Sequence, residues 1–156
     1  MAALSLVLFS GDYDRAMAAF TIANGAAGAG DKVTVFFTFW GVSLLRKKKG
    51  TGQSLLQTVF KKLMPCGPGR LPLSRFNFAG LGPALLRRLI RQKKGQTLEE
   101  LLHLASERGV EFVVCQASLN LLGLTLQELA PLPRLRVGDV HDFLQTAKNS
   151  AICLFV

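Results

Sequence analysis

Cysteine is scarce in this chain of 156 residues, which contains three. Cys66, Cys115 and Cys153 are an odd number at wide spacings, and this argues against a framework of disulfide bonds. The two histidines, His103 and His141, have no metal-like spacing to any cysteine, so the sequence predicts no metal site. A few unpaired cysteines are compatible with a reactive thiol.

Long apolar runs are also absent, since a membrane-spanning helix needs about 20 apolar residues. The longest run, residues 33–45, is shorter and includes Thr34, Thr38 and Ser43. The N-terminus has no basic region and no cleavage pattern of a secretory signal, so we expect a cytoplasmic protein. The glycine-rich residues 25–32 lie between an expected helix and strand, the reverse of the order in a phosphate-binding loop. We therefore expect no nucleotide or other cofactor.

Acidic residues are missing between Asp31 and Glu99, and this gap holds 14 of the 19 basic residues. The formal net charge of +9 therefore belongs mainly to one insert, residues 46–94. Such charge runs are usually solvated faces, but they also suit an acidic protein partner or an anionic membrane surface. The insert has no nucleic-acid motif, and its phenylalanines do not alternate with the cations, so nucleic acid is not an expected partner.

What the chain does have is apolar segments of strand length. Hydrophobic residues make up 49% of it and the mean hydropathy is +0.31, which is typical of a parallel sheet buried on both faces. Strands that alternate with helices pair in parallel through right-handed crossovers. The predicted fold is therefore α/β, a three-layer α/β/α sandwich in one domain, residues 1–156. Strands are expected at residues 4–9, 33–40, 110–115, 135–137 and 151–156.

Helices are predicted from caps and from apolar stripes. Asp12 is a candidate N-cap, and Thr97 and Thr125 begin capping boxes. Residues 50–82 are rich in glycine and proline, so we expect a mobile basic cover after the second strand. Helices are expected at residues 12–25, 41–48, 53–63, 83–91, 97–109 and 139–149, with a turn near residues 118–123.

Cys115 is the strongest candidate for a functional residue. It ends an apolar strand and precedes a new helix, whose dipole favours a thiolate at a sheet edge where ligands bind. Cys66, in a glycine- and proline-rich loop, is a possible second thiol, whereas Cys153 is expected in the core. The ends of the first three strands should meet beside Cys115 and form a pocket. Its predicted lining residues are Ser10, Gly11, Asp12, Trp40, Gly41, Gln116, Ser118 and Asn120.

Several segments of the chain carry a family resemblance. They are Thr38-Phe39-Trp40-Gly41, Leu44-Leu45-Arg46-Lys47, Met64-Pro65 with Gly67-Pro68, Cys115-Gln116-Ala117-Ser118 and the closing Ala151-Ile152-Cys153-Leu154-Phe155-Val156. Together they resemble the DsrE-like family, in its branch of longer proteins with a basic insert. The resemblance implies a five-stranded parallel fold, a homo-oligomer, and a sulfur carrier or sulfurtransferase in which Cys115 holds a persulfide. It also implies that the sulfur donor or acceptor is a separate carrier protein.

A second class of function stays open beside this one. In it the protein is a non-catalytic binding or scaffold protein whose basic insert docks an acidic partner or a membrane surface, and whose cysteines are structural. The reactivity of the thiols separates the two classes. In either class, so apolar a terminal strand favours a homo-oligomer that covers it.

Overall fold

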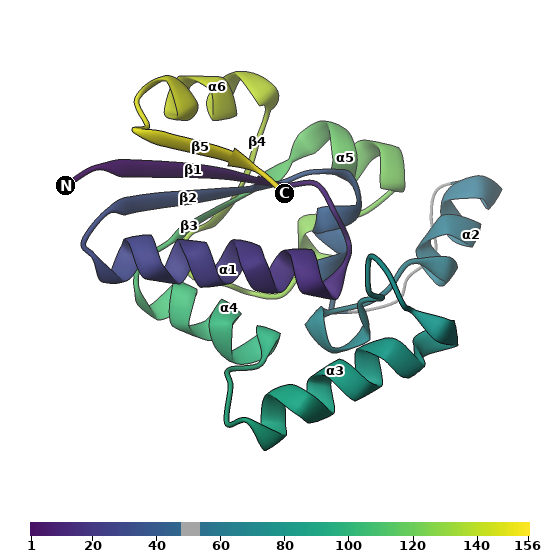
Figure 1. Cartoon of the computed structure of the whole chain (residues 1–156). Coiled ribbons are helices and arrows are strands. Elements are labelled where there is room, and N and C mark those ends of the chain that lie inside the picture. Colours follow the sequence, from purple (N-terminus) through teal and green to yellow (C-terminus); the bar gives the residue numbers. More distant parts are fainter. Residues whose placement is uncertain (48–53) are drawn as a thin grey trace.

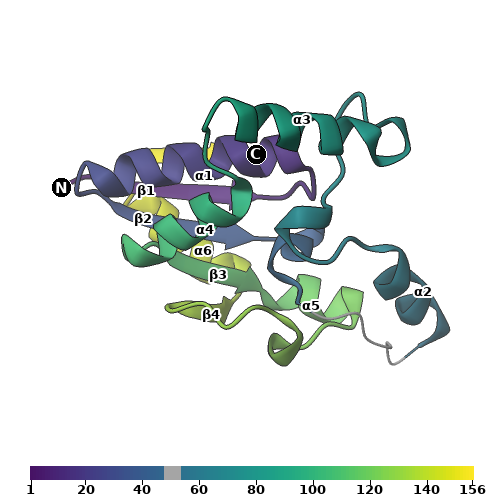
Figure 2. The same cartoon turned by 90° about the horizontal axis from the view of Figure 1, so that it is seen from below.

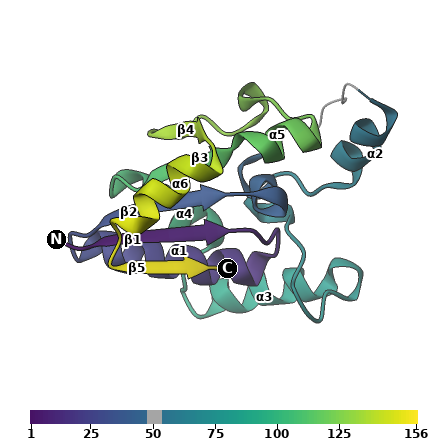
Figure 3. The ribbon, with the colours of Figure 1, turned by 90° about the horizontal axis from the view of Figure 1, so that it is seen from above.

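The computed structural model describes residues 1–47 and 54–156. Within these residues five strands, labelled in Figure 1, form one parallel sheet, and Figure 3 shows their order, β4-β3-β2-β1-β5. The predicted α/β class and five-stranded parallel sheet are confirmed. The strands are β1 (Ala3–Leu8), β2 (Lys32–Phe37), β3 (Glu111–Cys115), β4 (Leu135–Gly138) and β5 (Ile152–Phe155).

Helices cover both faces of the sheet. Figure 1 shows α1 (Tyr13–Gly28) and α4 (Leu98–Glu107) below it, and in Figure 2, seen from that side, they lie in front of the strands. Figures 1 and 3 show α6 (Val140–Lys148) on the opposite face. The remaining helical segments are η1 (Phe39–Leu45), α2 (Leu55–Leu63), η2 (Pro68–Arg70), η3 (Phe78–Gly80), α3 (Leu81–Gln92), α5 (Gln116–Leu122) and η4 (Leu126–Glu128). Among the residues that the structure describes, no helix is long and apolar enough to cross a bilayer.

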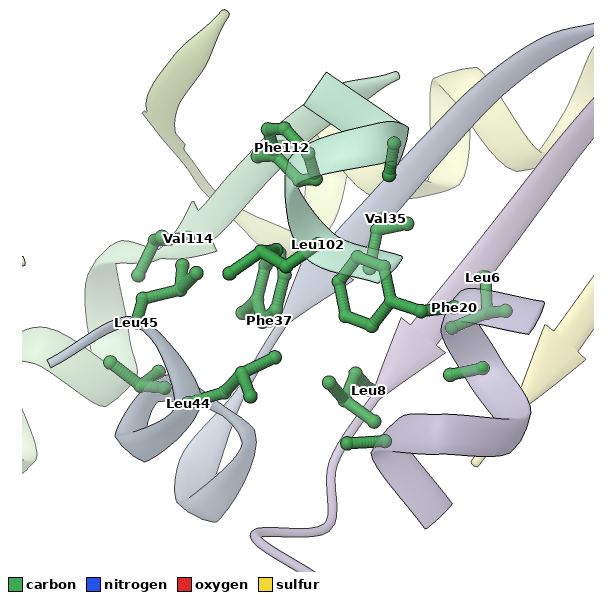
Figure 4. Close-up of a cluster of buried hydrophobic side chains, with 14 of the residues drawn as sticks. Leu6, Leu8, Phe20, Val35, Phe37, Leu44, Leu45, Leu102, Phe112 and Val114 are labelled. Atoms are coloured by element: carbon green, nitrogen blue, oxygen red, sulfur yellow. The ribbon is translucent and has the colours of Figure 1, made fainter. Parts of the chain in front are cut away.

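The main core lies between the sheet and α1 and α4. Phe20 of α1, Phe37 of β2 and Phe112 of β3 are buried there, with ring centroids 6.2 to 6.5 Å apart (Figure 4). Side chains alternate between the faces of a strand. Phe36 and Cys115 therefore belong to a smaller cluster on the other face, against which Phe143 of α6 packs.

The second strand ends earlier than predicted, at Phe37 instead of Trp40. The chain turns into η1, where Gly41 is needed because the Leu8 carbonyl oxygen occupies the place of a side chain. The apolar residues Phe39 and Trp40 continue the strand pattern in the sequence, yet 42% and 41% of their surfaces are exposed. A run of apolar residues does not by itself show where burial stops.

Other predicted boundaries also need correction. Instead of a helix over residues 41–48 the chain forms the 3₁₀ segment η1, which ends at Leu45, and residue 48 lies outside the described residues. The predicted helix at 53–63 corresponds to α2, with residue 53 likewise outside them. The predicted turn near residues 118–123 is mostly helix α5, and Gly123 alone takes the left-handed conformation, with φ 65°.

The prediction that Cys153 lies in the core is wrong, because its side chain is exposed. β5 is the outermost strand beside β1, and Ile152 and Phe155 are 50% and 71% exposed. An apolar strand is typical of the centre of a parallel sheet, but the pattern does not distinguish a central strand from an edge strand that another chain covers.

Two cations of the insert are buried, not surface charges. The Arg46 side chain, 1% exposed, donates to the carbonyl oxygens of Lys61 (3.2 Å), Met64 (3.4 Å) and Pro65 (3.4 Å). Lys61 pairs with Glu128 at 2.8 Å. Reading Arg46 as part of a solvated basic cover is therefore wrong. Buried charges require such partners. The bonds of Arg46 hold the start of the insert on α2 and the segment that follows it, and the Lys61–Glu128 pair attaches α2 to the rest of the domain.

Candidate functional site

Cys115 is the last residue of β3 and the N-cap of α5. Its side chain is 3% exposed and packs with Val7, Phe36 and Val113 on the face of the sheet that α6 covers. The parallel register places Cys115 opposite Gly138, at the carboxyl end of β4. The thiol thus lies at the sheet edge where the strand-end pattern placed it, below the surface.

Polar groups from two elements surround the thiol. The Thr38 hydroxyl, at the end of β2, lies 3.0 Å from the Ser118 hydroxyl of α5. The Phe39 backbone N–H donates to the same Ser118 oxygen at 2.9 Å. These contacts join the ends of β2 and β3 around the sulfur. Ser118 was predicted as a lining residue, and Thr38 was not.

The pKa of the Cys115 thiol lies below its usual range. Burial raises this pKa, but the Ser118 N–H, the hydroxyls of Ser118 and Thr38, and the Ala117 N–H lower it by more, because each can donate to the thiolate. The thiolate, not the thiol, is the nucleophile in sulfur chemistry. The surroundings of Cys115 therefore favour the thiolate over the thiol.

Four of the predicted lining residues come together in a pocket of about 320 Å³ at the ends of β1 and β2. Cys115, Gln116, Ser118 and Asn120 are not among its lining residues, so the structure divides the predicted site into a pocket and a separate thiol. The pocket is lined by Phe9, Ser10, Gly11, Asp12, Arg15, Trp40, Ser43, Pro65 and Pro72.

The other predicted lining residues have different roles. Gly41 is buried against Leu8, as described above. Gln116 and Asn120 are exposed, and the Gln116 amide donates to the Asn120 side chain at 2.8 Å. They lie on the solvent side of α5 and present a polar surface next to the thiol.

Cys66 is half-buried, and its thiol donates to the Arg46 carbonyl oxygen at 3.4 Å. Its neighbour Pro65 lines the pocket. Cys66 itself is not among the lining residues of the pocket. In the part of the chain that the structure describes, no group of three or more histidine, cysteine or acidic side chains could hold a metal ion.

A row of aromatic side chains crosses the same sheet edge. Phe9, after β1, lies between Phe39 and Phe155, with ring centroids 5.4 and 5.8 Å away. Phe39 and Phe155 are 42% and 71% exposed. Since the Phe39 N–H is bound to Ser118, this aromatic row begins beside the thiol. No local pattern in the sequence indicates this row, because the three residues come together only through the order of the strands.

Replacing Thr38 by valine and Ser118 by alanine together is expected to raise the pKa of Cys115, because the thiolate loses the two hydroxyls that can donate to it. A higher pKa means less thiolate at neutral pH, so the alkylation of Cys115 moves to higher pH. The pH dependence of alkylation by iodoacetamide, followed by mass spectrometry, measures this shift. Cys153 is the internal reference, and an unchanged profile for Cys115 would show that the two hydroxyls do not control it.

The fold and the site define an α/β sandwich protein with a thiol at a strand end. The model of the DsrE/DsrF/DrsH-like family matches residues 2–155, and the chain therefore belongs to this family.

Two relatives match nearly the whole chain. An uncharacterised protein of Bacillus subtilis, YrkE, is 41% identical over 154 residues, which are 97% of this chain and 95% of YrkE. The sulfur carrier protein DsrE2 of Allochromatium vinosum is 29% identical over 157 residues, covering 98% of this chain and 97% of DsrE2. The crystal structure of the ychN protein from E. coli matches this structure over 100% of both chains, with a TM-score of 0.62 and 10% sequence identity. This match shows that the two proteins share a fold.

Proposed function

We propose that the protein is a sulfur carrier that holds a persulfide on Cys115. The observation that carries the proposal is a strand-end thiol whose pKa is lowered by donors from Thr38, Ala117 and Ser118. Membership of the family, and a relative named a sulfur carrier, support a sulfur-related role. The donor and the acceptor of the sulfur are then separate proteins or small persulfides.

The chemistry needs a nucleophile and no redox partner. The Cys115 thiolate attacks the outer sulfur of a donor persulfide; a new S–S bond forms, the donor's S–S bond breaks, and the donor leaves as a thiolate. In the second half, an acceptor thiolate attacks the outer sulfur of the Cys115 persulfide. Cys115 then leaves as a thiolate, which the same donors stabilise. Both halves conserve electrons, because one S–S bond replaces another.

Burial of the thiol has a consequence for this cycle. With 3% of Cys115 exposed, both transfers require local opening around the end of β3. Between transfers the closed arrangement shields the persulfide from thiols in solution. Loading should therefore be selective for small or well-matched donors.

Incubation of the protein with inorganic polysulfide, followed by intact-mass measurement, tests the proposal. The protein is expected to gain the mass of one sulfur atom, and dithiothreitol should remove it. A mass that does not change under conditions in which free cysteine is persulfidated would contradict the carrier function.

We also propose that the chain forms a homo-oligomer through β5. This outermost strand exposes Ile152, Cys153 and Phe155, and Phe155 continues the aromatic row toward the thiol. An exposed apolar edge strand favours pairing with another chain. Light scattering should give a mass above the 16.9 kDa of the monomer, and Phe155→Ser should lower it. A monomer at micromolar concentration would contradict this assembly.

A further inference from the structure

Helix α2 has its apolar face turned to solvent. Leu56 and Phe60, one helical turn apart, are 73% and 48% exposed. The polar side packs on the domain instead: the Gln57 amide donates to the Asn120 carbonyl oxygen at 3.1 Å, and Lys61 pairs with Glu128. This orientation is the reverse of that in an ordinary surface helix. The exposed apolar residues of α2 are Leu55, Leu56, Val59, Phe60 and Leu63.

Helix α3 shows a second exposed apolar stripe. Leu81, Leu85 and Leu89, each one turn apart, are 73%, 61% and 46% exposed, while Leu86 and Ile90 pack against the core. Phe78 and Leu81 line a groove of about 440 Å³ together with Leu85 and Arg88. Phe76 and Phe78, 75% and 67% exposed, extend the stripe beyond the start of α3.

These two helices contribute to one side of the molecule. In Figures 1, 2 and 3, α2 and the N-terminal end of α3 lie on the same side, beyond the carboxyl ends of the strands. We call their exposed apolar residues, with Phe76 and Phe78, the insert patch. Single apolar residues are normal on a surface, but each of these two helices exposes a row of them, which indicates an interaction site.

The charged side chains of the insert itself are of one sign, because no acidic residue occurs in the sequence between Asp31 and Glu99. Lys62 on α2 and Arg88 on α3 are exposed. Arg91 is exposed too, but it shares a hollow with Glu99 and Glu100 of α4. A partner that covers the patch must therefore accept both apolar side chains and cations.

We propose that the insert patch docks on the surface of an anionic lipid bilayer. Amphipathic helices with leucine and phenylalanine on one face and cations at its border bind in the interface, where the cations meet lipid phosphates. A second copy of this chain fits less well, because a two-fold contact between two insert patches would bring cations against cations. Cys115 takes no part in this contact, so the inference goes beyond the proposed function and does not rest on it.

Flotation of the purified full chain with lipid vesicles tests the proposal. The protein is expected to float with vesicles of phosphatidylcholine and phosphatidylglycerol and not with phosphatidylcholine alone. Binding should weaken with salt, which screens charges over about 8 Å at physiological ionic strength. Cys115→Ser should float like the wild type, which separates this result from the fate of the carrier function.

Two double variants locate the contact. Leu56→Ser with Phe60→Ser is expected to weaken vesicle binding by about tenfold or more, because the variant has two fewer apolar side chains to bury in the bilayer. Ile22→Ser with Leu144→Ser, at positions 41% and 48% exposed on α1 and α6, is the matched control and should bind normally. All four substitutions are at exposed positions, and thermal unfolding checks that both variants remain folded.

Several outcomes would overturn the proposal. They are the absence of binding to anionic vesicles, equal binding to neutral ones, and equal losses in the two double variants. If instead Leu56→Ser with Phe60→Ser lowers the mass seen by light scattering while no vesicles bind, the insert patch is an interface between copies. Capture of an acidic protein without vesicle binding would overturn it in the same way.

Discussion

Replacing Cys115 by serine is expected to abolish persulfide loading of the protein from inorganic polysulfide. Serine has nearly the size of cysteine, and Thr38 and Ser118 remain available as hydrogen-bond partners, so the fold is retained. The hydroxyl is not deprotonated near neutral pH and accepts no sulfane sulfur, so the nucleophile is lost. Intact-mass measurement before and after incubation gives the loaded fraction directly.

The other two cysteines provide matched controls. Cys153→Ser removes an exposed thiol and Cys66→Ser a half-buried one, and both variants are expected to load like the wild type. If Cys115→Ser still loads and Cys66→Ser does not, the sulfur acceptor is Cys66 and the assignment of the site is wrong. Loss only in Cys153→Ser would move the site to β5. Full loading of Cys115→Ser contradicts the proposal in either case.

Replacing Arg46 by methionine is expected to lower the free energy of unfolding by about 3 kcal/mol. The variant leaves carbonyl oxygens of Lys61, Met64 and Pro65 without their buried donor, and an unmet polar group in the interior costs about 1–3 kcal/mol. Methionine retains much of the apolar stem of arginine, so the loss comes mainly from polar contacts. Denaturation by urea measures the change.

Arg70 offers the control for this variant, because it is an exposed cation of the same insert. Arg70→Met is expected to change the free energy of unfolding by less than about 0.5 kcal/mol. Equal stability of Arg46→Met and the wild type would mean that the buried contacts of Arg46 do not stabilise the fold.

Much of the fold could be predicted because its strands are almost wholly apolar and bounded by glycine or polar residues. Val35 and Val113 lie in strands that were placed correctly for this reason. The misplaced end of β2 at Trp40 and the exposed Cys153 share one cause. Both are apolar residues near the limits of the sheet, where hydropathy alone does not distinguish burial by this chain from exposure.

The insert shows a different limit. The sequence reveals its charge, but not that Lys61 points inward to Glu128 while Leu56 points outward. The spacing of α2 residues defines an amphipathic helix and says nothing about which face meets the domain. That choice depends on polar groups supplied by Asn120 and Glu128, far along the chain.

The residues of the candidate site also differ in whether a local sequence pattern indicates them. Cys115 could be found from local sequence, since a strand end followed by a helix is a local pattern. The same rule would also indicate Thr38 if the second strand were predicted to end at Phe37, where it does end. The aromatic row of Phe9, Phe39 and Phe155 requires the order of β5, β1 and β2, which no local pattern contains.

The most direct test of the central claim is to locate the sulfane sulfur on the loaded wild-type protein. Trypsin cleaves after lysine and arginine, so it places Cys66, Cys115 and Cys153 on separate peptides, residues 63–70, 109–134 and 149–156. After loading with polysulfide, blocking with iodoacetamide and digestion, mass spectrometry should find the extra sulfur on the peptide of residues 109–134. Extra sulfur confined to either of the other two peptides would contradict the account.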